Sequence, residues 1–348
     1  MKKLSLVFVL FLMTTAFAWW NPDWKSRFVV EITSNYPVKD YQVLLTLDTQ
    51  TPISEGKMAY NCEDIRVVDE NDKKLLPFFI QDCNSPETKI WIKTDVPEKK
   101  KIYVYFNNPK CKESVTNPQD VFIVADTFDL SQLNTSIWQI QKTTSDTYTI
   151  QDGVLTVTDD STDGVDFSIR SLKVFPEATR IIATFRRDSD FSGQSSTERI
   201  ALGMLGDSGY ALIQFLYNNP YFTAEVYRAS DRTKETVTWD FGMAKGTSYD
   251  VEIIRLTDDY YRFIINGIRQ EIKPLKISGN WSAYFTVSGA TASLFDIYVT
   301  KYIEPEPEAV VKKEERASFF TEYGTYIIVV GVVIASGLLL VNLLGGRE

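Results

Sequence analysis

Residues 248–270 read SYDVEIIRLTDDYYRFIINGIRQ, and this stretch indicates which kind of fold to expect. Two short runs, Tyr249–Leu256 and Tyr260–Ile265, are rich in the β-branched and aromatic side chains typical of strands. Asp258 and Asp259 supply turn chemistry between them, and Asn266-Gly267 is a strong hairpin signal. The stretch therefore predicts consecutive antiparallel strands rather than a helix.

The same pattern continues in both directions over residues 128–301. Glycines and Asn219-Pro220 separate further short apolar or alternating runs. The predicted strands are Thr147–Ile150, Val154–Thr158, Phe167–Ser171, Arg180–Arg186, Arg199–Leu205, Tyr210–Tyr217, Tyr221–Tyr227, Thr236–Trp239, Ser282–Val287 and Leu294–Thr300. So many strands in this length predict a two-sheet jelly roll, which we bound at residues 121–302.

A smaller all-β domain is predicted before it, over residues 19–115. No helical period longer than two turns occurs there, and DENDK at 69–73 and NSPE at 84–87 are turn sequences. Its predicted strands are Phe28–Ile32, Tyr41–Leu47, Asp64–Val68, Leu75–Ile80, Lys89–Lys93 and Lys101–Phe106. The expected fold class is therefore all-β, with two β-sandwich domains.

Four segments of this first domain resemble, in order, the domain of unknown function 2341. They are WWNPDWKSRF at 19–28, CEDIRVVDENDKKLLPFFI at 62–80, TKIWIKT at 88–94 and IYVYFNNP at 102–109. Two departures from the family pattern are Phe106-Asn107-Asn108 in place of Tyr-Gly-Asn and Val67-Val68 in place of Phe-Thr. The resemblance implies an exported protein, often with a lectin-like sandwich beside this domain and sometimes with a proton-channel-type membrane subunit, but it implies no activity.

The second domain resembles the concanavalin A-like lectin/glucanase sandwich, including the laminin G-like group. The resemblance rests on FDLSQLNTSIW at 128–138, TIQDGVLTVT at 149–158, the stretch at 248–270 and FDIYVT at 295–300. Each motif mostly reflects strand and turn chemistry. The resemblance implies the sandwich fold, and it offers sugar binding, glycoside hydrolysis and a calcium site as functions to test.

Residues 1–18 have the form of a secretory signal peptide. Lys2 and Lys3 precede the apolar run Leu4–Met13, and Ala16-Phe17-Ala18 is a small-x-small cleavage site. An uncleaved N-terminal anchor is the alternative. Either way, we expect the bulk of the chain to lie outside the cell.

The C-terminal stretch Tyr326–Leu344 has nineteen residues and no charge. This length suffices for a helix that crosses a bilayer core of about 30 Å. We predict a membrane helix at 323–344, preceded by an extended stalk at 303–322 and followed by a cytoplasmic tail at 345–348. Gly331-x-x-x-Ala335 would allow two such helices to pack closely, so a homodimer is an open alternative.

The composition excludes several functions. The 46 acidic residues exceed the 37 basic ones, giving a net charge of −9, which argues against nucleic acid or an anionic lipid surface as partner. The chain contains no histidine, so Ser-His-Asp and Cys-His catalysis and histidine-ligated zinc are excluded.

Cys62, Cys83 and Cys111 are the three cysteines. Outside the cell a disulfide is the default, and we predict Cys62–Cys83 because both flank strands that can pair. Cys111 would then be free or bonded to another molecule.

Glycoside hydrolysis on such a sandwich would need carboxylates at alternate positions of one strand, as in E-x-D-x-E. Glu198 and Glu225 have no acidic residue two positions on, and Asp250 and Glu252 lack a third acid. The sequence therefore predicts a protein that is not an enzyme, with no cofactor.

Sugar binding through exposed aromatic rings is the favoured function. The rings considered are Tyr210, Tyr217, Tyr221, Tyr227, Trp239, Trp281 and Tyr284, and those selected as ligand-binding are Tyr217, Tyr221, Tyr227, Trp239 and Trp281. The competing interpretation is that most of them fill the sandwich core, because side chains alternate between the faces of a strand.

Two further kinds of site are predicted from loops. Asp126, Asp129, Asp163 and Asp207 are candidate calcium ligands, although no D-x-D-x-D-G loop occurs. Asn134-Thr135-Ser136 and Asn280-Trp281-Ser282 are N-glycosylation sequons.

Together these features predict an exported, single-pass membrane protein that displays its larger sandwich at the cell surface. The expected partner is a glycan, a cell-wall polymer or an envelope protein. The alternative is an accessory or sensory ectodomain of a membrane protein complex.

Overall fold

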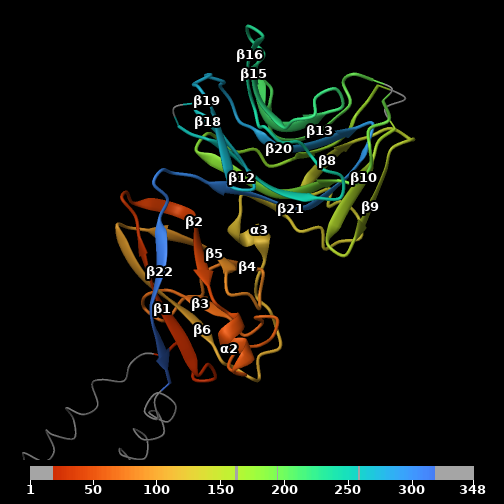
Figure 1. Ribbon diagram of the computed structural model, residues 1–348. Helices are drawn as coiled ribbons and strands as arrows, with labels where there is room; N and C mark the ends of the chain where they lie inside the picture. Colours follow the sequence, from red (N-terminus) through yellow and green to blue (C-terminus); the bar gives the residue numbers. More distant parts are fainter. Residues whose placement is uncertain (1–18, 161–163, 194, 258, 318–348) are drawn as a thin grey trace, which may run out of the picture. The chain divides into compact units, whose positions relative to one another are not determined.

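The chain forms two compact units in a computed structural model that describes residues 19–160, 164–193, 195–257 and 259–317. Unit 2 comprises residues 118–306, and it is inserted between the two segments of unit 1, residues up to 117 and residues from 307 onward (Figure 1). The predicted signal peptide, membrane helix and cytoplasmic tail lie outside the described residues. Among the described residues, no helix has the length and apolar character to cross a bilayer.

Unit 1 consists of two antiparallel sheets. The four-stranded sheet has the order β22-β1-β6-β3, formed by β22 (Glu308–Arg316), β1 (Ser26–Thr33), β6 (Lys99–Phe106) and β3 (Arg66–Val68). The three-stranded sheet has the order β2-β5-β4, formed by β2 (Val38–Leu47), β5 (Thr88–Val96) and β4 (Phe78–Gln81), and one short helix, α2 (Gln50–Ser54), follows β2.

The predicted stalk at 303–322 is wrong for its central part. Residues Glu308–Arg316 form β22, which pairs with β1 from Ser26↔Arg316 to Thr33↔Glu308, with one irregularity at Val29/Val30. An edge strand buries little of its surface and tolerates many charges, so its charged composition resembles that of a solvated spacer. The last described segment therefore completes the sheet that the first one begins.

One disulfide stabilises unit 1, and it is the predicted one. Cys62 and Cys83 are bonded, with their Cα atoms 6.0 Å apart. Cys111 is a free, partly buried thiol, and the Arg66 guanidinium donates to its sulfur over 3.2 Å.

The tryptophan-rich start packs on the tyrosines of β6 and encloses Arg27. The Arg27 guanidinium lies 4.5 Å from the Trp19 ring and 3.9 Å from the Tyr103 ring. It donates a hydrogen bond to the Tyr105 hydroxyl over 2.6 Å and forms ion pairs with Asp72 and Glu315. Because Glu315 belongs to β22, this buried cation joins the start of unit 1 to its last strand.

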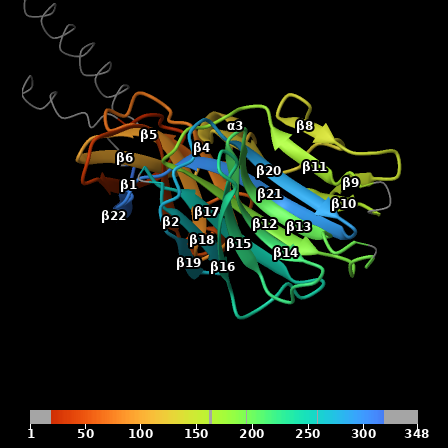
Figure 2. The same ribbon diagram turned by 90° about the horizontal axis from the view of Figure 1, so that it is seen from above.

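Unit 2 is a sandwich of two antiparallel sheets, drawn as two stacked layers in Figure 1 and seen from above in Figure 2. One sheet has the order β16-β15-β14-β13-β20-β11-β8, with β16 (Thr233–Thr238), β15 (Thr223–Arg228), β14 (Gly209–Leu216), β13 (Arg199–Gly206), β20 (Ser282–Ser288), β11 (Phe167–Ser171) and β8 (Trp138–Gln141). The other has the order β19-β18-β17-β12-β21-β10-β9, with β19 (Ile268–Ile272), β18 (Tyr261–Ile265), β17 (Ser248–Arg255), β12 (Thr179–Arg187), β21 (Thr291–Lys301), β10 (Val154–Thr158) and β9 (Thr147–Gln151). β7 (Val124–Asp126) also pairs with β21, and the short helix α3 (Pro118–Val121) precedes it.

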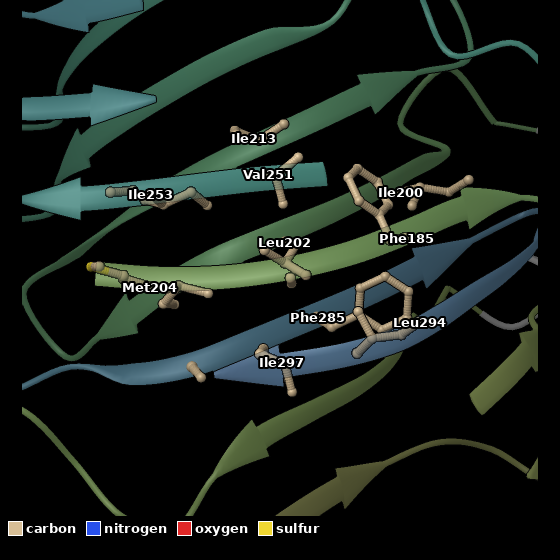
Figure 3. Packing of buried hydrophobic residues seen from close by; sticks show 14 of the residues in the cluster. Phe185, Ile200, Leu202, Met204, Ile213, Val251, Ile253, Phe285, Leu294 and Ile297 are labelled. Carbon is tan, nitrogen blue, oxygen red and sulfur yellow. The ribbon is translucent and has the colours of Figure 1, made fainter. Parts of the chain in front are cut away.

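The core of unit 2 lies between these sheets. Figure 3 shows Ile200, Leu202 and Met204 of β13 packed with residues of the facing sheet such as Val251 and Ile297. All of these side chains are fully or almost fully buried. The all-β, two-sandwich prediction is confirmed for the described residues, and the alternation along β13 places its intervening side chains on the opposite face of the sheet.

Candidate functional site

The outward face of the seven-stranded sheet carries the candidate site. On β14, Ala211, Ile213 and Phe215 belong to the core, so Tyr210 and Gln214 point away from it. The same alternation on β15 places Ala224 and Val226 in the core and leaves the residues between them outside.

Strand register brings the outward side chains into rows. One row runs Lys234, Tyr227, Tyr210, Leu205, Ser282 across five neighbouring strands, because each of these residues is paired with the next. The adjacent row runs Thr236, Glu225, Leu212, Gly203, Tyr284, Arg170. Polar and aromatic side chains thus cross the sheet perpendicular to the strands.

Glu225 is the centre of a hydrogen-bonded group on this face. The Tyr210 hydroxyl donates to one carboxylate oxygen over 2.5 Å, and the Gln214 amide donates to the other over 3.3 Å. The Lys234 ammonium lies 3.1 Å from that second oxygen. Burial, together with the hydrogen bond to Glu225 and its charge, raises the pKa of Tyr210, so the phenol remains a proton donor.

Two rings lie side by side next to this carboxylate. The Tyr210 and Tyr227 rings stack with centroids 5.1 Å apart and an interplanar angle of 26°. On neighbouring β13 the outward residues Ala201 and Gly203 have small or no side chains, whereas Leu205 is paired with Tyr210. We call Tyr210, Tyr227, Glu225, Gln214 and Lys234 the tyrosine face.

The five rings predicted to bind ligand fall in three places. Tyr227 belongs to the tyrosine face. Tyr217 and Tyr221 lie beyond the end of β14, with 49% and 45% of their surfaces exposed. Trp239 and Trp281 are only 2% and 1% exposed and belong to the core, so they are corrected to structural residues.

The error for the two tryptophans has a simple cause. Both lie next to strand ends, where the sequence alone does not show which of two alternating side chains points into the sandwich. The Trp239 indole donates to the Ile268 carbonyl over 3.1 Å, and the Trp281 ring packs 4.9 Å from the Arg255 guanidinium. Sequence reasoning also missed Gln214 and Lys234, because only cross-strand register brings them to Glu225.

The predicted calcium ligands have other contacts. Asp126 accepts hydrogen bonds from the Trp138 indole and the Phe128 amide, over 2.6 and 2.8 Å, and burial raises its pKa. Asp129 accepts a hydrogen bond from Thr127 and Asp207 lies 3.7 Å from Arg170, whereas Asp163 lies outside the described residues. Within the described ranges, no group of three or more acidic or cysteine side chains could hold a metal ion.

The two sequons remain predictions. The Asn134 side-chain oxygen accepts hydrogen bonds from the Ser136 amide and hydroxyl, over 3.0 and 2.7 Å, within a partly exposed turn. Asn280 lies in an exposed loop before β20.

Comparison with solved structures finds enzymes of low similarity. A glycosyl hydrolase family protein from Mycobacterium fortuitum is 14% identical over 51% of this chain and 99% of its own, with a TM-score of 0.40. Porphyranase B from Zobellia galactanivorans is 9% identical over 54% of this chain and 91% of its own, with a TM-score of 0.41. An endo-1,3-beta-glucanase from Streptomyces sioyaensis is 12% identical over 55% and 96%, with a TM-score of 0.39.

Comparison with protein families finds one match. No curated protein matches the chain. The resemblance predicted over residues 19–109 is confirmed in part, since the matching region starts later and continues past residue 117, where the first segment of unit 1 ends. The family model described as domain of unknown function (DUF2341) matches residues 61–141, which is less than half of the chain.

Proposed function

We propose that unit 2 binds a glycan chain on the tyrosine face. The supporting observation is the stacked Tyr210–Tyr227 pair beside a hydrogen-bonded carboxylate, since aromatic rings pack on the apolar faces of sugars while polar side chains bind the hydroxyls. The carboxylate is held in place, because Tyr210 and Gln214 of the neighbouring strand β14 donate to its two oxygens. Pre-orientation lowers the entropic cost of binding.

The chemistry of each group assigns a role to it. The Glu225 carboxylate has lone pairs that its protein partners do not use, and these accept hydrogen bonds from sugar hydroxyls. Lys234 has more than half of its side chain exposed, and its ammonium has further N–H groups to donate to a sugar oxygen besides its ion pair with Glu225. A chain that follows the row from Lys234 to Ser282 would cross the strands and contact both rings.

Affinity electrophoresis tests this proposal. The full chain is run through gels containing one soluble polysaccharide each: laminarin, xylan, hydroxyethyl cellulose, porphyran or mannan. We expect at least one to retard the protein and Tyr227→Ala to weaken that retardation about five- to tenfold, the equivalent of about 1–1.4 kcal/mol for a lost ring contact. Tyr260→Ala is the matched control, because Tyr260 is 39% exposed next to β18 of the other sheet. No retardation by any polymer, or equal effects of the two variants, would refute the proposal.

We also propose that this binding unit is displayed outside the cell and held at the membrane. Three features support it: the signal-peptide pattern of residues 1–18, the uncharged stretch Tyr326–Leu344 and the disulfide, which forms in oxidising compartments. Protease treatment of intact cells should cleave the protein, and the full chain should sediment with membranes until detergent is added. Complete protection of the chain in intact cells would exclude display.

A further inference from the structure

A hollow of about 340 Å³ opens at the end of β14, away from the tyrosine face. Its lining residues are Arg187, Asp190, Phe191, Phe215, Tyr217 and the turn 218–220. It includes Tyr217, the most exposed of the rings predicted to bind ligand. Phe215 belongs to the core and Phe191 packs against it, but neither the core nor the tyrosine face accounts for Arg187, Asp190 and Tyr217.

Arg187 is the unusual member of the lining. Only 15% of its side chain is exposed, and its guanidinium lies 5.2 Å from the Phe215 ring and 5.9 Å from the Phe191 ring. Its buried Nε donates no hydrogen bond to any group of the described residues. Its ion pair with Asp190 is loose, at 3.8 Å. Buried donors without acceptors are costly, so this guanidinium suits an acceptor that the chain itself does not supply.

The local charge favours an anion as that acceptor. Lys245 lies 2.8 Å from Asp190, and its hydrogen bond and charge lower the pKa of this carboxyl. Arg187 and Lys245 thus share the carboxylate of Asp190, so these three side chains together carry one positive charge in excess. A guanidinium that is weakly hydrated and stacked on rings is well suited to bind a planar carboxylate.

The walls of the hollow are held in place by a buried carboxylate. Glu198 is fully buried, and it accepts hydrogen bonds from the Ser192 hydroxyl and from the Gly193 and Ser195 amides, over 2.6, 2.9 and 2.9 Å. The Tyr217 amide donates to the Glu198 carbonyl over 3.0 Å. The loop that carries Phe191 and the strand end that carries Tyr217 are therefore fixed to one residue, so the hollow is pre-formed.

We propose that this hollow binds a single uronic acid residue of a glycan. The carboxylate of the sugar would pair with Arg187, its ring would pack on Tyr217, and the side chains of the turn 218–220 would reach its hydroxyls. The volume suits one or two sugar rings rather than a long chain. The proposal narrows the ligand class of unit 2 without requiring that the tyrosine face bind anything.

Titration of the full chain with small probes, followed by saturation-transfer NMR, tests this. The probes are D-glucuronate, D-galacturonate, D-glucose and acetate. We expect at least one uronate to bind at least tenfold more tightly than both glucose and acetate. Raising NaCl from about 20 to 500 mM should reduce that preference, since screening weakens ion pairs. If no uronate binds more tightly than acetate, the hollow recognises only a carboxylate and not a sugar ring, and the proposal is overturned.

Variants locate the binding. Tyr217→Ala should weaken uronate binding at least fivefold, and Arg187→Gln should remove the preference for uronate over glucose. Tyr221→Ala is the matched control, because Tyr221 is exposed to nearly the same extent but does not line the hollow. Tyr227→Ala should also leave uronate binding unchanged, so a failure of the tyrosine face and a failure of the hollow give different results. If Arg187→Gln does not fold, the Tyr217→Ala variant and the salt dependence still decide. Uronate binding that survives Tyr217→Ala unchanged would overturn the assignment.

Discussion

Removal of the Arg27 side-chain charge should destabilise unit 1 by about 3 kcal/mol. Arg27 and Asp72 are each only 6% exposed, and breaking a buried pair by deleting one partner costs about 3–5 kcal/mol. The lower end applies to Arg27→Met, because Asp72 keeps the hydrogen bond from the Tyr105 hydroxyl over 2.8 Å and Glu315 can turn toward water. For a unit of this size, about 3 kcal/mol corresponds to a fall in melting temperature of about 12–24 °C.

Hydrogen exchange read by mass spectrometry is the appropriate assay, since it assigns the change to one unit. In Arg27→Met, amides of β1, β6 and β22 that exchange through global opening of unit 1 should exchange about 100-fold faster, while those of β13 and β20 stay unchanged. Arg316→Met, which removes an exposed arginine of β22, should change exchange less than about fivefold. Arg27→Met with Asp72→Asn should recover part of the loss, because asparagine tolerates the positive φ of 55° at that position. Equal exchange in Arg27→Met and Arg316→Met would refute the inference that the buried cation stabilises this unit.

Three further predictions concern single features. Cys62→Ser with Cys83→Ser should lower the free energy of unfolding of unit 1 by about 3 kcal/mol in a denaturant titration, from the loop entropy of a sequence separation of 21. Gly289→Ala should lower the free energy of unfolding of unit 2 by about 2–5 kcal/mol, because the new Cβ would lie 2.4 Å from the carboxyl carbon of the buried Glu198. Gly246 has a similar positive φ but open space around it, so Gly246→Ala should lower this free energy by only about 1–2 kcal/mol in the same titration. Hydrogen bonds from Lys99 and from Lys312 of β22 lower the pKa of Glu31. The stability that this adds to the β1–β22 pair is present above the ordinary glutamate pKa and is lost as pH falls through the lowered pKa. Hydrogen exchange of the β22 amides, normalised for the intrinsic rate, should therefore rise from pH 6 to pH 3.

The all-β architecture was predictable because strands of this kind carry their own signals. The run at 248–270 forms β17, β18 and β19 as expected, with a tight turn at Asn266-Gly267, where both residues have positive φ. β22 was not predictable, because its stabilising contacts come from β1, nearly 290 positions earlier in the chain. A solvated spacer and a charged edge strand share one composition, and only the presence of a free edge on β1 distinguishes them.

The candidate site shows a similar limit at the level of single side chains. Trp239 and Trp281, predicted to bind ligand, fill the core, whereas Tyr210, which is outside that predicted set, lies in the tyrosine face. Alternate side chains of a strand point to opposite faces of the sheet, and which set faces the core depends on pairings with strands far apart in the sequence. The sequence shows the neighbours of Glu225 along its own strand, whereas its partners come from β14 and β16.

The tyrosine face is better suited to binding a glycan than to hydrolysing one. Retaining and inverting glycosidases both need two carboxyl groups, about 5–10 Å apart on either side of the bond. Glu225 is the one carboxylate among the outward side chains of the seven strands of this sheet, all of which are described. Both of its oxygens accept hydrogen bonds, from Tyr210 and Gln214, so this carboxylate is already held by side chains of the protein. We therefore predict that a polysaccharide that retards the protein is not cleaved by it, and that Glu225→Gln weakens retardation without changing the products. Release of reducing ends by the wild-type chain, abolished in Glu225→Gln, would show that a second carboxyl group outside these strands completes a catalytic pair.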